Sequence, residues 1–93
     1  MDILEHHSFS GIIRQAQLGT KVYARSSDAI EAVDLISMIE QLGDRILGMA
    51  RRGDLSVPRA ERLIADLLAC YAEPLKDARR IIEISREIRE GAR

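Results

Sequence analysis

The stretch RRGDLSVPRAERL, residues 51–63, separates two long segments of helical pattern. The first segment ends on two arginines and Gly53, and basic residues followed by glycine are common at the end of a helix. Ser56 and Pro58 then stand where the N-cap and first turn of a second helix are expected. The stretch is therefore predicted to turn the chain within a helical hairpin. The alternative is the turn of a helix-turn-helix that reads DNA.

The segment before the turn, residues 28–52, repeats its apolar residues at spacings of three and four. Such a heptad pattern is typical of a helix that buries one stripe of its surface. Ser27 or Asp28 is a candidate N-cap, and Asp28 with Glu31 resembles a capping box. The apolar stripe, called the heptad seam below, consists of Ala32, Leu35, Ile39, Leu42, Ile46 and Met49.

The segment after the turn, residues 57–90, is also helical in pattern but contains Pro74. Because proline lacks a backbone donor and clashes with the preceding turn, a kink or break is predicted near residues 70–73. The apolar stripe of this segment ends at Ile88, and Ile84 lies outside it. Ile84 therefore counts as surplus apolar surface.

A shorter N-terminal helix is predicted over residues 9–24, where Phe9, Ile12, Ala16, Gly19 and Tyr23 share one face. Ser8 or Ser10 is the candidate N-cap. The predicted fold is all-α: a single domain over residues 1–93, built on a long antiparallel hairpin of residues 28–52 and 57–90 with the N-terminal helix packed on it.

The composition agrees with a small helical protein. Hydrophobic residues make up 46% of the 93 residues but aromatic residues only 3%, and 31% are charged. The formal net charge of −1 gives no overall attraction to nucleic acid or to acidic lipid. A single cysteine and the lack of a long apolar run indicate a cytoplasmic protein that does not enter a membrane.

Residues that commonly carry chemistry are few and scattered. His6 and His7 are adjacent, so on a helix their side chains diverge by about 100° and suit one metal ion poorly. Cys70 lies beside an apolar stripe, far in sequence from either histidine, which favours a structural role over a nucleophilic one. No catalytic set, metal-spaced cluster or phosphate-binding loop is present in the sequence. We therefore expect neither enzymatic activity nor a cofactor.

The surplus of aliphatic residues predicts protein–protein contacts. A chain of this length buries a modest core, and exposed apolar faces on small proteins usually meet a second copy or another protein. We expect a homodimer and one further protein partner, and the function of a small regulator such as an inhibitor, an adaptor or a chaperone-like factor. The expected interface residues are Leu35, Ile39, Leu42, Ile46, Met49, Ile84 and Ile88.

The alternative is a DNA-binding transcriptional regulator whose helix-turn-helix-like segment covers residues 45–68. Its candidate contacts to nucleic acid are Arg45, Arg51, Arg52, Arg59 and Arg62. Against it, the first helix is too long for the compact motif. Glu61 and Asp66 also place negative charge on the helix that would read the bases.

Overall fold

The computed structural model describes residues 3–16 and 26–90, with side chains described from residue 30 onward in the second range. All regular structure in these residues is helical. The elements are the 3-10 helix η1 (Ile3–Glu5) and the α-helices α1 (Phe9–Ala16), α2 (Ser26–Arg52), α3 (Val57–Ala72) and α4 (Ala78–Arg89).

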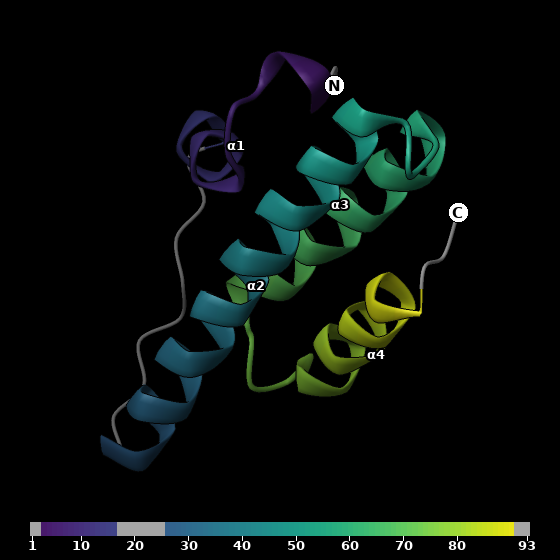
Figure 1. Ribbon diagram of the computed structural model, residues 1–93. Helices are drawn as coiled ribbons and strands as arrows, with labels where there is room; N and C mark the ends of the chain where they lie inside the picture. The colour runs from purple at the N-terminus through teal and green to yellow at the C-terminus, as the bar shows by residue number, and fades with distance from the viewer. Residues whose placement is uncertain (1–2, 17–25, 91–93) are drawn as a thin grey trace.

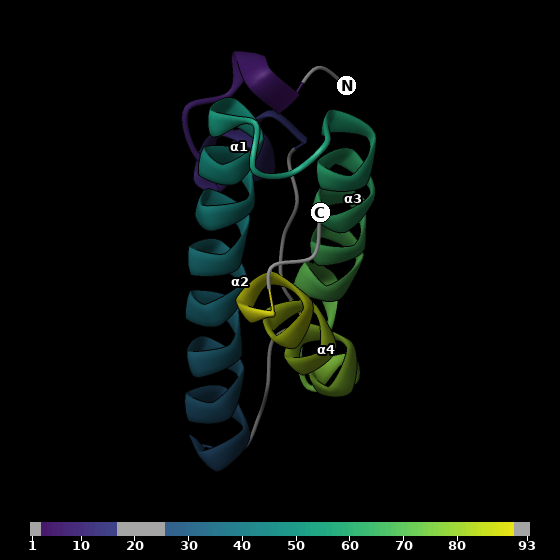
Figure 2. The ribbon, with the colours of Figure 1, turned by 45° about the vertical axis from the view of Figure 1, so that its right-hand side comes forward.

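Helices α2 and α3 run antiparallel, side by side, and form the predicted hairpin (Figures 1 and 2). Gly53 ends α2 with a φ of 79°, a left-handed conformation that glycine adopts without strain. The Gly53 amide donates to the Ala50 carbonyl at 3.2 Å and the Asp54 amide to the Met49 carbonyl at 2.9 Å. This pair of bonds is a Schellman motif, which satisfies carbonyls that the helix end leaves free. Residues 51–63 thus turn the chain between two antiparallel helices of a hairpin, as predicted.

The N-cap expectations have mixed outcomes. Ser56 occupies the N-cap position of α3, and Pro58 lies in the first turn, as predicted. The side chain of Ser56, however, makes no capping hydrogen bond. The proposed caps Ser27 and Asp28 fall where side chains are not described.

Residues 57–90 form two helices and not the single hairpin arm that the sequence predicts. α3 ends at Ala72, and the break lies at residues 73–77 rather than 70–73. Glu73, the residue before Pro74, has φ −139° and ψ 72° and so lies outside the helical region. The proline ring disfavours the helical conformation of the preceding residue, which explains why the helix stops there.

After this break, α4 folds back against both α2 and α3 (Figure 2). It buries Ile81, Ile84 and Ile88, each at most 2% exposed. Ile84 is therefore a core residue, and its assignment to surplus apolar surface is wrong. Because α4 begins a new helix after the break, the stripe of α3 does not set which face of α4 is buried.

The short helix α1 begins at Phe9 as predicted, while residues 17–24 of the predicted helix lie outside the described residues. The Ser8 hydroxyl accepts a hydrogen bond from the Gly11 amide at 3.2 Å and so acts as the N-cap. Phe9 is fully buried against Gly43 of α2, where a larger residue would overlap its ring. Asp44 Oδ1 accepts from the Phe9 amide at 2.8 Å. These contacts fix α1 on α2.

The core forms one cluster that draws on η1 and all four α-helices. The larger side chains of the heptad seam, from Leu35 to Met49, lie in this cluster, and every seam residue including Ala32 is at most 9% exposed. No helix among the described residues combines the length and the apolarity needed to cross a membrane.

Candidate functional site

The seven residues predicted to form an interface are core residues of a single copy. The most exposed of them, Leu35 and Met49, are each only 9% exposed, and Ile39, Ile46 and Ile84 are fully buried. These side chains already pack against the chain's own helices. A second copy or another protein would therefore meet different side chains, and the exposed apolar residues are the candidates.

Two of these exposed apolar residues lie together near the start of α2. Ile30 is 65% exposed and Val33 is 63% exposed, and their spacing of three places them side by side on the helix. Glu31 and Asp34 beside them are also exposed. The beginning of α2 extends past the described ends of α3 and α4 in both views (Figures 1 and 2). Ile30, Val33, Glu31 and Asp34 are called the α2 outer face below.

A second exposed face, which carries three arginines, lies on α4. Ile82 is 49% exposed, and Arg79, Arg86 and Arg89 are exposed as well. Their spacings of three, four and three place all four on one side of the helix. This set, called the α4 outer face, combines an aliphatic centre with three positive charges, and the exposed carboxylates of Glu83 and Glu90 lie beside it.

The five arginines considered for nucleic-acid binding are placed in different surroundings. Arg51 donates to the His6 carbonyl, and Arg52 pairs with Asp54 at 3.0 Å. Arg59 pairs with a glutamate of α4, whereas Arg45 is exposed on α2 and Arg62 on α3. The antiparallel hairpin also differs from a helix-turn-helix, whose helices cross at about 90–120°. Nothing in this arrangement favours the DNA alternative.

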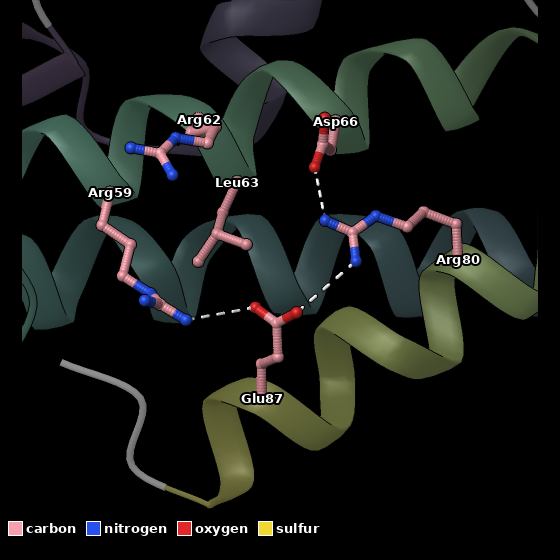
Figure 3. A pocket seen from close by; sticks show the side chains of 6 residues that line it. All are labelled: Arg59, Arg62, Leu63, Asp66, Arg80 and Glu87. Carbon is pink, nitrogen blue, oxygen red and sulfur yellow. Dashed lines mark hydrogen bonds and ion pairs between the residues drawn. The ribbon is translucent and has the colours of Figure 1, made fainter.

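A charged pocket lies between α3 and α4 (Figure 3). Glu87 of α4 bridges two arginines: Arg59 Nη2 lies 3.5 Å from Oε2, and Arg80 Nη1 lies 3.5 Å from Oε1. Arg80 also pairs with Asp66 of α3 and, at 3.5 Å, with Glu83. The hydrogen bond to Asp66, helped by the nearby negative charges, raises the pKa of Arg80, so this guanidinium remains charged.

The pocket has a volume of about 170 Å³ and is lined by Arg59, Arg62, Leu63, Asp66, Arg80 and Glu87. Three guanidiniums thus face two carboxylates. The local spacing of charged residues predicts pairs within one helix, but Arg59 and Glu87 are 28 positions apart. The fold brings these residues together, and no local signal in the sequence could have indicated it.

The candidate nucleophile and metal ligands are not assembled into a site. Cys70 is buried and 3% exposed. Burial raises the pKa of the Cys70 thiol to about 11, with help from the charges of Asp77 and Asp66. The thiol therefore stays protonated at neutral pH. Within residues 3–16 and 26–90, no group of three or more His, Cys, Asp or Glu side chains is arranged to hold a metal ion.

Comparison with known proteins adds no family or fold relationship: no protein-family model matches the chain, and searches of curated proteins and of solved structures gave no significant match.

Proposed function

We propose that this protein is a small, non-enzymatic protein-binding regulator whose α2 outer face covers a helix of its partner. The observation that carries the proposal is the exposure of Ile30 and Val33, at 65% and 63%. Complete burial of an aliphatic side chain contributes about 1.5–3 kcal/mol, so covering the exposed parts of both contributes roughly 2–4 kcal/mol. Glu31 and Asp34 form a negative rim that selects a basic partner surface.

The first partner in this proposal is a second copy of the chain. The α2 outer face is aliphatic with a negative rim, and the α4 outer face is aliphatic with three arginines. Since each copy carries both faces, two copies offer two complementary contacts. A different protein with an aliphatic and basic helix would compete for the same α2 outer face. Such competition is a simple route to inhibition by occlusion.

Charge reversal tests this pairing. Glu31→Arg with Asp34→Arg makes the α2 outer face positive, and Arg86→Glu with Arg89→Glu makes the α4 outer face negative. Each pair of changes alone places like charges opposite one another, so each should yield monomers in light scattering. All four changes in one chain restore opposite charges and should restore the dimer.

The four-fold variant distinguishes surface pairing from loss of folding. All four residues are exposed, so circular dichroism should show a helical fold in every variant. A four-fold variant that remains monomeric while the wild type is dimeric would reject the pairing of α2 with α4.

A further inference from the structure

The charged pocket between α3 and α4 has more donors than its own acceptors satisfy. A guanidinium carries five N–H donors, and strong bonds between guanidinium and carboxylate are about 2.7–2.9 Å long. Arg59 reaches Glu87 at 3.5 Å, and this carboxylate is shared with Arg80. Glu87 therefore balances neither arginine fully.

Two further observations point to a missing acceptor. The Nε atom of Arg59 is buried and has no hydrogen-bond partner, which is uncommon for a buried donor. Arg62, which also lines the pocket, makes no ion pair or hydrogen bond with the part of the chain that the structure describes. Arg80, by contrast, is engaged by three carboxylates. The guanidinium donors that remain without an acceptor are thus those of Arg59 and Arg62.

The positions of these two arginines suit a small anion. Arg59 and Arg62 are three residues apart on α3, so they project from adjacent turns of the same helix face (Figure 3). The planar guanidinium fork matches the geometry of carboxylate and phosphate groups. The pocket volume of about 170 Å³ is several times the roughly 30 Å³ that a water molecule occupies in the liquid, so a small oxyanion has room.

We propose that this pocket is a binding site for a compact oxyanion, a carboxylate or phosphate group, held by Arg59 and Arg62. The oxyanion supplies the acceptors that these guanidiniums lack, while Arg80 and Asp66 hold the other end of the pocket in place. The site lies on α3 and α4 and does not depend on the α2 outer face. It can therefore exist whether or not the proposed partner binding is correct.

The test is an NMR titration of the ¹⁵N-labelled protein that follows backbone amides and arginine Nε–H signals. Inorganic phosphate is added in one series and N-acetylglutamate amide in another, with ionic strength held constant by sodium chloride. Saturable shifts at Arg59 and at the neighbouring residues of α3 and α4 are expected. Tighter binding of phosphate would assign the site to phosphate groups, and tighter binding of the glutamate derivative would assign it to acidic side chains.

Variants separate a specific site from general charge attraction. Arg62→Gln should weaken binding about tenfold, since a hydrogen bond to a charged group contributes about that factor. Arg62→Lys keeps the charge but loses the planar fork, so it should also bind more weakly. Arg45→Gln removes an exposed arginine on α2, outside the pocket and outside both outer faces, and should leave the affinity unchanged.

Glu87→Gln should change the affinity for the anion in the opposite direction. It removes the carboxylate that competes for Arg59, so the affinity for phosphate should rise. Melting curves by circular dichroism confirm that each variant is folded. The proposal is overturned if the shifts do not saturate, or if Arg62→Gln and Arg45→Gln have equal effects on affinity.

Discussion

Replacing Gly43 with alanine tests how α1 is fixed to α2. A Cβ atom at position 43 would overlap the Cβ, Cγ and Cδ1 atoms of Phe9, which is fully buried. Gly48, five residues later on the same helix, has much more room. A Cβ there would meet only the Arg52 Nη1 atom, at 3.4 Å, at the end of a flexible side chain.

The expected changes in stability follow from two opposing effects. Alanine stabilises a helix interior by about 0.8–1.0 kcal/mol relative to glycine. At Gly43 this gain is opposed by overpacking, which costs about 1–3 kcal/mol, or by expulsion of Phe9, which costs about 3–5 kcal/mol. We expect Gly43→Ala to lower the free energy of unfolding by about 2 kcal/mol. Gly48→Ala should raise it by about 0.5–1 kcal/mol.

Thermal and urea unfolding followed by circular dichroism measure both variants. A loss of about 2 kcal/mol corresponds to a decrease of roughly 8–16 °C in Tm for a domain of this size. The decisive comparison is the sign of the difference between the two alanine variants. If Gly43→Ala melts at or above the temperature of Gly48→Ala, then Phe9 does not pack on Gly43 and the placement of α1 is wrong.

Four further predictions concern the core, the thiol and the arginines. Leu42→Asp should unfold the protein, because Leu42 is only 7% exposed and an unpaired carboxylate there costs several kcal/mol. This cost is comparable to the whole stability of a small domain. An unchanged melting curve would place Leu42 in solvent. Cys70 should resist iodoacetamide at pH 8 until the protein is unfolded, and rapid alkylation of the folded protein would contradict its burial. Folding raises the pKa of the Cys70 thiol from 9.0 to about 11. The stability that the protonated thiol contributes is therefore present below pH 9 and is lost as the pH rises to about 11. Cys70→Ala should reduce this dependence of stability on pH. Gel shifts at near-physiological salt should show no sequence-specific complex with the gene's upstream DNA, and a specific complex lost on changing Arg59 and Arg62 to alanine would restore the DNA alternative.

The hairpin was predictable because its determinants are local. Repeated apolar spacing identifies α2, and Gly53 marks its end through a conformation that glycine adopts readily. Pro74 indicated the end of α3 for a similar reason, although the break lies slightly later than predicted. These features act within a few residues along the chain, so the sequence displays them directly.

The packing of α4 and α1 was less predictable because it depends on contacts between distant residues. Ile84 was assigned to the surface because the apolar stripe of the segment after the turn was continued past Pro74. The chain changes direction there, and Ile84 is buried. No periodic pattern in the sequence marks the contact between Phe9 and Gly43. A glycine inside a helical pattern is the one feature of the sequence that indicates a close approach there. The pairing of Arg59 with Glu87 likewise arises only when α4 folds back.

The central claim, that the α2 outer face binds protein, is tested most directly by the mass in solution of the wild type and of an Ile30→Asp, Val33→Asp variant. Light scattering at micromolar concentration should give about twice the chain mass of 10.4 kDa for the wild type and 10.4 kDa for the variant. A control with the same added charge, Ala65→Asp with Ala69→Asp on exposed positions of α3, should remain dimeric. A wild type that is monomeric at all concentrations, or an equal mass for the wild type and the α2 variant, would contradict the claim.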